Sequence, residues 1–247
     1  MIKLGDYMLK AVFFDLDGTL IHMDEKKFLE IYFYTMGKWM TERGYSGERF
    51  IDGVVAGTRA MYKNDGSATN EEVFWQHFGA AYGPVSEAEK QVMEDYYNGD
   101  FNLTLTACSG TPEAQEIIKF CRKAGLITVL STNPLFPKVA TIKRMALSGL
   151  SEEDFHLVTS YENSSFCKPN PAYFTDLLEK FDLSPDEVLV FGNNTFEDGE
   201  CALGAGIKCY VIETEDLIES EKATHDFCRI KITEVVDTIK QNLEEKR

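Results

Sequence analysis

Two aspartates near the start of the chain, Asp15 and Asp17, have a spacing that could serve chemistry on a phosphate ester. They follow the apolar run from Ala11 to Phe14, and one residue separates them. Because side chains alternate in direction along a strand, and the turn at Gly18 alters that alternation, the two carboxylates can face different atoms. One can attack phosphorus while the other moves a proton. Taken alone, the Asp-x-Asp pair is a weak signal, since acidic residues are common turn formers at strand ends.

Polar residues of complementary types follow later apolar runs as well. A lysine and a hydroxyl group would neutralise the equatorial oxygens of a transferring phosphoryl group. A hard divalent cation bound by carboxylate and carbonyl oxygens would offset the repulsion between two anions. The candidates are Thr132 and Asn133 after Ile127 to Leu130, Asn193 and Asp198 after Val188 to Phe191, and Lys168 in the loop between these runs.

Short apolar runs that alternate with helical patterns predict the elements that position these residues. Runs of this length that close in a polar turn are typical of buried parallel strands. We therefore expect an α/β fold with a Rossmann-like doubly wound parallel sheet, whose ligand lies outside the carboxyl ends of the strands. The expected strands are 11–14, 127–130, 157–159, 188–191 and 209–212, and the expected helices are 113–123, 137–147, 171–181 and 197–204.

The stretch from about Met23 to Leu105 breaks this alternation. It holds aromatic and apolar residues at helical spacing, such as Phe28, Tyr32 and Trp39, and no convincing strand interrupts it. We expect a mostly α-helical cap domain over residues 22–105, inserted into a core domain formed by residues 1–21 and 106–247. The aromatic residues could line a substrate pocket, although aromatic residues at helical spacing more often belong to a hydrophobic core.

Two polar features near these segments carry no predicted role. His22 directly follows the first aspartates, where the chain enters the insert, and we expect a solvated linker residue there. The acidic stretch from Glu213 to Glu221 is expected to be a solvated face.

Composition limits the classes of partner. The formal net charge of −16 over 247 residues argues against a general affinity for nucleic acid or anionic membranes. No stretch approaches the roughly 18 apolar residues needed to span a bilayer. The six cysteines form no CxxC pair, and the first residues lack the apolar run of a signal peptide, so we expect a cytoplasmic protein with reduced thiols. The same negative field would repel a phosphorylated substrate, which makes a local positive site necessary.

Four segments resemble the motifs of the haloacid dehalogenase-like hydrolase superfamily. The first matches along its whole length and is highly specific, whereas the second is short. The matching parts cover roughly residues 8–21 and 106–215, and the insert resembles the helical first-position (C1) cap of this family in place and helical character. The segments are AVFFDLDGTLI from Ala11, STN from Ser131, CKPNPAYF from Cys167 and GNNTFEDGECALGAGIKCYVI from Gly192.

This resemblance implies a role for each motif residue. Asp15 would attack phosphorus, and its carboxylate would ligate Mg²⁺. Asp17 would protonate the leaving alcohol and then deprotonate the hydrolytic water, while its backbone carbonyl also ligates the metal. The remaining implied roles are Thr132 as hydrogen-bond donor to the phosphoryl group, Lys168 as partner of that group and of the nucleophile, and Gly18, Thr19 and Asn133 as substrate-binding residues.

One position departs from the family pattern. The fourth motif usually begins with Gly-Asp, but this chain has Gly192 followed by Asn193. Three interpretations stay open. Asn193 ligates the metal through its carbonyl oxygen, with Glu197 or Asp198 supplying charge directly or through water. Alternatively, the site prefers another ion or is weakly active, or the chain has lost catalysis and keeps a ligand-binding role.

The expected function is that of a Mg²⁺-dependent phosphomonoesterase acting on a small phosphorylated metabolite, of the sugar phosphate or nucleotide type, through an aspartyl-phosphate intermediate. The alternatives are a metal-independent 2-haloacid dehalogenase and a catalytically weakened binding protein. Asp17 argues against the dehalogenase, since dehalogenases of this family lack an acid there, whereas the loss of the acid at Asn193 leans towards it. The sequence leaves open a phosphomutase, the exact ester and the oligomeric state.

Overall fold

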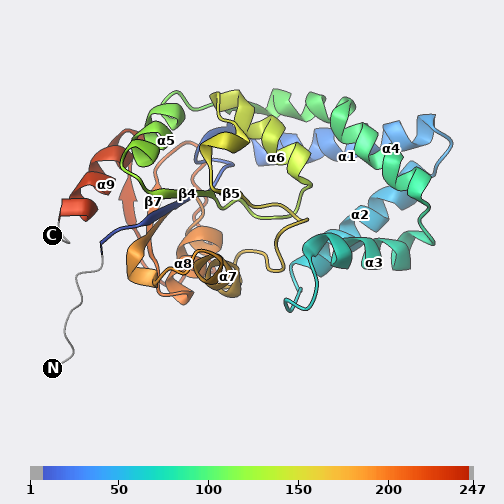
Figure 1. The fold of residues 1–247 in the computed structure, drawn as a ribbon. Coiled ribbons are helices and arrows are strands. Elements are labelled where there is room, and N and C mark those ends of the chain that lie inside the picture. The colour runs from blue at the N-terminus through green and yellow to red at the C-terminus, as the bar shows by residue number, and fades with distance from the viewer. Residues whose placement is uncertain (1–7, 245–247) are drawn as a thin grey trace.

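A computed structural model describes residues 8–244 of the chain (Figure 1). Within these residues lies a six-stranded sheet whose neighbouring strands all pair in parallel. Numbered by appearance within this sheet, the strand order is 3-2-1-4-5-6, that of a Rossmann-type doubly wound sheet, which confirms the expected fold class. From one edge to the other the strands are β5 (Leu157–Val158), β4 (Ile127–Leu130), β1 (Ala11–Phe14), β6 (Val188–Gly192), β7 (Lys208–Ile212) and β8 (Cys228–Ile230).

Helices cover both faces of the sheet. Every residue of the central strand β1 is therefore buried, and all of them are apolar. Val12 and Phe14 belong to the cluster that contains α5 (Ala114–Lys123) and α9 (Val235–Glu244). The alternate residues of β1 pack on the opposite face, with α7 (Ala172–Lys180) and α8 (Cys201–Gly204). Figure 1 shows these two helical layers with the sheet between them.

The strand order reverses at β1, which lies between β4 and β6. An aromatic stack crosses the sheet at this point. The ring of Phe14 stacks on Phe191 at 5.4 Å between centroids, and Phe191 stacks on Tyr210 at 5.5 Å. This packing fixes the carboxyl ends of the strands where a ligand of such a sheet is expected.

The insert leaves and re-enters the core through a short antiparallel ribbon of β2 (Ile21–Met23) and β3 (Cys108–Gly110). Side chains of Asp24, Ser46, Thr69 and Ser86 cap the N-termini of its four α-helices. The helices extend from one end of the sheet (Figure 1). They are α1 (Glu25–Glu42), α2 (Gly47–Met61), α3 (Asn70–Tyr82) and α4 (Glu87–Asn98), followed by the 3₁₀-helix η1 (Asp100–Ala107).

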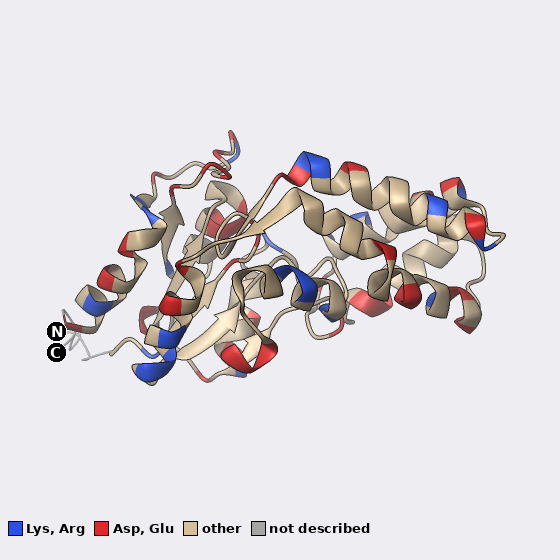
Figure 2. Cartoon of the chain, turned by 90° about the horizontal axis from the view of Figure 1, so that it is seen from above, with Lys and Arg blue, Asp and Glu red and all other residues tan. Residues whose placement is uncertain are grey.

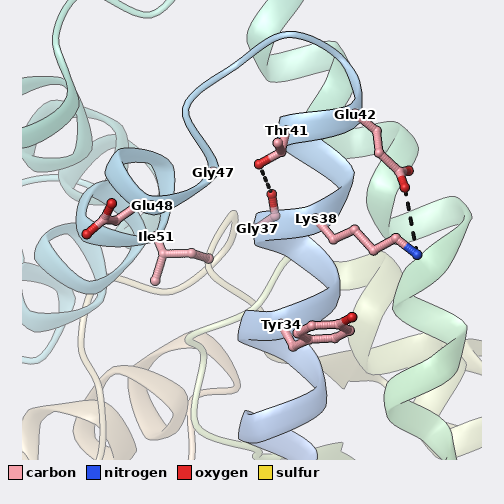
Figure 3. Close-up of a pocket in the computed structure, with 8 residues that line it drawn as sticks. All are labelled: Tyr34, Gly37, Lys38, Thr41, Glu42, Gly47, Glu48 and Ile51. Carbon is pink, nitrogen blue, oxygen red and sulfur yellow. Dashed lines mark hydrogen bonds and ion pairs between the residues drawn. The ribbon is translucent and has the colours of Figure 1, made fainter.

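The helices α1 and α2 approach closely because glycines face each other at their contact. A Cβ atom at Gly47 would collide with the backbone of Gly37. Figure 3 shows this contact from the outside, where a shallow surface groove runs past Tyr34 and Ile51. The buried aromatic cluster of the insert also takes in Tyr161 and Cys167 from outside it, so the domain boundaries stay a prediction.

The remaining described elements connect the strands and helices of the core. They are α6 (Lys138–Met145), the 3₁₀-helices η2 (Ala146–Ser148), η3 (Glu152–Asp154), η4 (Pro185–Glu187) and η6 (Ile232–Glu234), and a π-helix, η5 (Thr195–Glu200). The expected helix 197–204 is helical throughout, as the end of the π-helix η5 followed by the α-helix α8.

Acidic residues and cysteines are distributed along the described part of the chain. Figure 2 shows acidic residues spread over both the core and the insert. All six cysteines are free thiols, of which Cys108 is half-buried, Cys228 is exposed and the other four are buried. Among residues 8–244, no helix has both the length and the apolar character needed to cross a membrane.

Candidate active site

A buried lysine joins two aspartates at the switch point of the sheet. Asp15 directly follows β1, and Lys168 Nζ donates a hydrogen bond of 2.7 Å to its Oδ1 atom. The same Nζ atom donates to Asp198 Oδ1 at 2.5 Å. Lys168 is only 1% exposed, and a charge buried so deeply requires such partners. The sequence-predicted nucleophile and lysine therefore lie in direct contact.

Burial and neighbouring charges act in opposite directions on the pKa values of this cluster. Burial raises the pKa of Asp15, and the carboxylates of Asp198 and Asp17 raise it further, while Lys168 opposes the rise. Burial alone would lower the pKa of Lys168, but Asp15 and Asp198 more than offset it and hold that pKa well above its usual range. The lysine is therefore a permanent cation, and an additional cation beside Asp15 would relieve the repulsion among the carboxylates.

Asp17 is held by a residue that the motifs did not predict. Arg144, in α6, is buried, and its Nη1 atom donates to Asp17 Oδ2 at 2.7 Å. The guanidinium group also lies over the ring of Phe136, at 4.9 Å from its centroid. Burial raises the pKa of Asp17, and Arg144 opposes that rise more strongly than Lys168 does. Asp17 Oδ1 is buried without a hydrogen-bond partner among the described residues.

The loop after β4 places two further predicted residues. Thr132 is buried, and its backbone oxygen accepts hydrogen bonds from Thr159 Oγ1 at 2.7 Å and Tyr173 Oη at 3.0 Å. The amide nitrogen of Asn133 donates to the backbone oxygen of Lys168 at 3.2 Å and to Glu197 Oε2 at 3.1 Å. Both side chains are therefore presented from a loop that its neighbours hold in place.

Asp198 supports the lysine with both of its oxygens engaged. While Oδ1 accepts from Lys168, Oδ2 accepts from the backbone N–H of Asn194 at 3.0 Å. The π-helix η5 begins after Asn194, and its wider turn is a local irregularity often found at functional sites. Burial raises the pKa of Glu197, with Lys168 opposing. The role of Asp198 as a metal ligand stays a prediction, since its two oxygens are used elsewhere in this geometry.

Asn193 lies against the turn that follows the nucleophile. Its amide nitrogen donates to the backbone oxygen of Asp216 at 2.6 Å, so its carbonyl oxygen is the atom left for a ligand. A Cβ atom at Gly18, where φ is +79°, would collide with this amide. Only glycine suits both the backbone conformation and the close approach. Thr19 is buried next to this turn, and its hydroxyl has no hydrogen-bond partner among the described residues.

The four glutamates of the acidic stretch after β7 are exposed, as expected of a solvated face, but Asp216 within it is half-buried and lines the cavity of the candidate site. Asp216 Oδ2 accepts from the backbone N–H of Met23 at 3.1 Å and lies 3.1 Å from His22 Nδ1. Thr214 Oγ1 donates to the backbone oxygen of Gly18 at 3.1 Å. His22 is therefore tied to the core and is not simply a solvated linker. Such contacts join residues up to 196 positions apart, which no local sequence pattern reveals.

A cavity of about 590 Å³ joins these groups to the insert. Thr19 is not among the residues of its wall, but all other predicted site residues are. The opposite part of the wall comes from α1, α2, α3 and α4 of the insert. The predicted residues that line it are Asp15, Asp17, Gly18, Thr132, Asn133, Lys168, Asn193 and Asp198.

The donor set fits a magnesium ion that shares its ligands with water and phosphate. Within the part of the chain that the structure describes, no three His, Cys, Asp or Glu residues are grouped to hold a metal. Mg²⁺ is usually bound through only one or two carboxylates, keeping several waters and substrate phosphate oxygens. The carboxylate of Asp15, the carbonyl of Asp17 and the side-chain oxygen of Asn193 are oxygen donors of this kind and would be the protein ligands of such an ion.

Comparisons with known proteins agree with this architecture. A HAD phosphatase from Thermococcus onnurineus is similar at a TM-score of 0.58 and 19% identity, over 94% of this chain and 98% of that one. A putative beta-phosphoglucomutase from Thermotoga maritima is similar at 0.56 and 20% identity, over 94% and 99%. The L-2-haloacid dehalogenase from Xanthobacter autotrophicus, with chloropropionic acid covalently bound, is similar at 0.55 and 15% identity, over 94% and 99%.

At such low identity, these structures demonstrate likeness of fold alone. No curated protein matches the chain by sequence. The family model described as haloacid dehalogenase-like hydrolase matches residues 9–206. The chain therefore belongs to the haloacid dehalogenase-like hydrolase family.

Proposed function

We propose that this hydrolase is a Mg²⁺-dependent phosphomonoesterase that acts on a small phosphorylated metabolite through an aspartyl-phosphate on Asp15. The observation that carries the proposal is the pairing of two neighbouring carboxylates with two different cations. Lys168 contacts Asp15 at 2.7 Å, and Arg144 contacts Asp17 at 2.7 Å. The carboxylates of Asp15 and Asp17 therefore have different surroundings. A nucleophile and a proton-transfer group require such a difference.

In the first step, Asp15 forms a bond to phosphorus through the carboxylate oxygen that does not accept from Lys168. The bond between phosphorus and the ester oxygen breaks, and Asp17 gives its proton to the departing alkoxide. Lys168 stabilises the charge on the phosphoryl oxygens, and Thr132 lies on the same wall to donate a hydrogen bond. Asn133 also lines this wall, with its amide N–H groups donating to the backbone oxygen of Lys168 and to Glu197.

In the second step, Asp17 takes a proton from water as the water oxygen attacks phosphorus. The bond between phosphorus and Asp15 then breaks, which releases phosphate and restores the carboxylate. A bound Mg²⁺ supplies positive charge that offsets the repulsion between the phosphate and the carboxylates, with Asp15, the carbonyl of Asp17 and Asn193 as its protein ligands.

Other residues position the reacting groups. Asp198 orients Lys168, and Glu197 orients Asn133, through the hydrogen bonds described above. Arg144 fixes one oxygen of Asp17 and leaves the other for proton transfer. Fixed positions of this kind are worth more in a buried site, where few water molecules screen the charges.

The test is hydrolysis of p-nitrophenyl phosphate with and without Mg²⁺, for the native protein and for Asp15→Asn. We expect release of phosphate that requires Mg²⁺, stops with a chelator and disappears in the variant. Release of inorganic phosphate distinguishes hydrolysis from a mutase, which returns the phosphoryl group to a sugar. Activity that persists in Asp15→Asn would contradict the proposal.

A second candidate is a metal-independent 2-haloacid dehalogenase, favoured by the neutral Asn193 in place of an acid. Here Asp15 would attack carbon and displace halide. The acid at Asp17 opposes this function, because such a displacement needs no proton for its leaving group. Halide release from 2-chloropropionate in the presence of a chelator would establish it and exclude the first proposal.

The biological setting is proposed on the same basis. Free thiols fit the reducing cytoplasm. A net charge of −16 disfavours nucleic acid and anionic membranes as partners, so the proposed partner is a small molecule.

A further inference from the structure

The two ends of the cavity differ in chemical character. At the core end, the wall consists of the charged and amide groups of the candidate active site. At the insert end, the wall is mostly aromatic and aliphatic. Leu29 and Tyr62 remain 36% and 42% exposed, and Phe33 and Val55 of α1 and α2 line the same space. A phosphate group would therefore sit beside polar residues while the rest of its ester meets apolar ones.

Two of the hydroxyl groups at the insert end are used within the protein. The hydroxyl groups of Tyr32 and Tyr97 are hydrogen-bonded to each other at 2.8 Å. The rings, rather than those hydroxyls, are what these residues offer to a ligand. Glu25 and Arg59 are the charged side chains that the insert contributes to the described wall, and both are exposed.

We infer that the ester's alcohol carries a hydrocarbon group with an aromatic ring, an assignment of substrate class that rests on the proposed phosphomonoesterase function. Sugar hydroxyls placed against the aromatic and aliphatic part of this wall would lose hydrogen bonds to water without replacement. A hydrocarbon instead gains from burial, by about fourfold in binding for each methylene group. The overall reaction is unchanged: ester and water become alcohol and phosphate.

The size of the cavity agrees with this assignment. A volume of about 590 Å³ lies in the range of small-molecule sites and leaves room beyond the phosphate for a ring and a short linker. Aromatic side chains prefer edge-to-face or offset contacts with other rings, and Phe28 and Phe136 already form such a contact on this wall, at 5.9 Å between centroids. The sugar phosphate or nucleotide type expected from family resemblance is disfavoured.

The first experiment compares kcat/KM for 2-phenylethyl phosphate and glucose 6-phosphate. Both are esters of primary alcohols, so their leaving groups are of similar reactivity. We expect 2-phenylethyl phosphate to be preferred by at least about tenfold. An equal value, or a preference for glucose 6-phosphate, overturns the assignment but leaves the phosphomonoesterase function intact.

Two variants then make the insert wall polar with little change of shape. Leu29→Asn and Val55→Thr should each lower the preference for 2-phenylethyl phosphate by at least about threefold. The matched control is Leu103→Asn, which makes the same chemical change at a leucine that is 49% exposed outside the cavity. A ratio that stays constant in both wall variants, or falls equally in the control, contradicts the assignment.

A binding measurement separates failure of the two proposals. Calorimetry would compare two uncleavable phosphonates, 3-phenylpropylphosphonate and 3,4-dihydroxybutylphosphonate, on the native protein with Mg²⁺. Tighter binding of the phenyl compound without hydrolysis of any ester supports the assignment of the wall and rejects the proposed function. Hydrolysis of both esters with tighter binding of the dihydroxy compound supports the function and rejects the assignment.

Discussion

The core and the insert place their functional side chains by different means. In the core, each reacting group sits at a strand end and is held by an ion pair or hydrogen bond, as Lys168 holds Asp15 at 2.7 Å. In the insert, buried rings pack on one another, as Phe50 does on Phe78 at 4.8 Å between centroids. Charge pairs impose distance and direction, whereas ring packing imposes shape. In the core, the positions of the candidate reacting groups therefore depend on a few ion pairs and hydrogen bonds. In the insert, the shape of the cavity wall depends on the packing of many side chains.

Of the substitutions considered, removal of the charge of Lys168 should have the largest effect on the core. In Lys168→Met, Asp15 and Asp198 are left buried together without a counter-charge, so kcat should fall by about 10²–10³-fold. Stability should fall by about 3–5 kcal/mol, because a buried ion pair loses one partner. The measurements are steady-state kinetics and denaturant unfolding. Lys180→Met, at an exposed pair with Asp176, is the control and should cost less than about 0.5 kcal/mol.

Arg144 tests whether a positioning contact acts on proton transfer. In Arg144→Met, we expect kcat for an alkyl phosphate to fall by about 10²-fold, because Asp17 loses the group that orients it. For p-nitrophenyl phosphate the loss should be smaller, since that leaving group needs little protonation. The ratio between the two esters is the readout, because loss of folded protein cannot change it.

Two companion variants check this interpretation. Arg144→Lys should restore part of the rate, and Arg122→Met, at an exposed pair with Asp154, should have little effect. Equal losses for both esters would show that Arg144 has only a structural role.

Asn193 sharpens the comparison within the core. Asn193→Asp should bind Mg²⁺ about tenfold more tightly, because it adds a charged ligand. Without metal, the same variant should be less stable by about 1–3 kcal/mol, because a carboxylate oxygen replaces the N–H that donates to the backbone oxygen of Asp216. Metal titration and unfolding with and without Mg²⁺ provide the two measurements. Unchanged or weaker Mg²⁺ affinity would show that Asn193 is not a ligand.

The insert should respond through packing alone. Gly47→Ala places a methyl group against the backbone of Gly37 and should destabilise the protein by about 1–3 kcal/mol. Gly79→Ala has open space around the new Cβ and should stabilise it by about 0.4–1 kcal/mol. Denaturant unfolding measures both. Equal effects at the two positions would contradict the close approach of α1 and α2.

The pattern of apolar residues along the sequence predicted the central strands of the core sheet. The runs Ala11–Phe14 and Ile127–Leu130 match β1 and β4, because buried strands of a parallel sheet are continuously apolar. The strands β2, β3 and β8 were missed, since three residues are too few to show a pattern and β8 is largely exposed. The family motifs located the groups at the strand ends, which the fold then brings together.

Contacts between distant segments were beyond such reasoning. Arg144 is 127 positions from Asp17, and its only local signal is its place beside Ala140 and Thr141 on the buried face of a helix. Asp216 appeared within an acidic run that resembles a solvated surface. Its role depends on how the segment after β7 returns to the first turn, which hydrophobic periodicity does not encode.

The segment around Asp216 has a mechanical consequence. Asp216 contacts His22 and Met23 of β2, the strand that leads into the insert. Its backbone oxygen also accepts a hydrogen bond from the amide of Asn193. A movement of the four helices that displaced β2 would therefore also displace Asn193, the proposed metal ligand. If the proposed function holds, a substitution at Asp216 would affect both the entry of substrate and the binding of the cation.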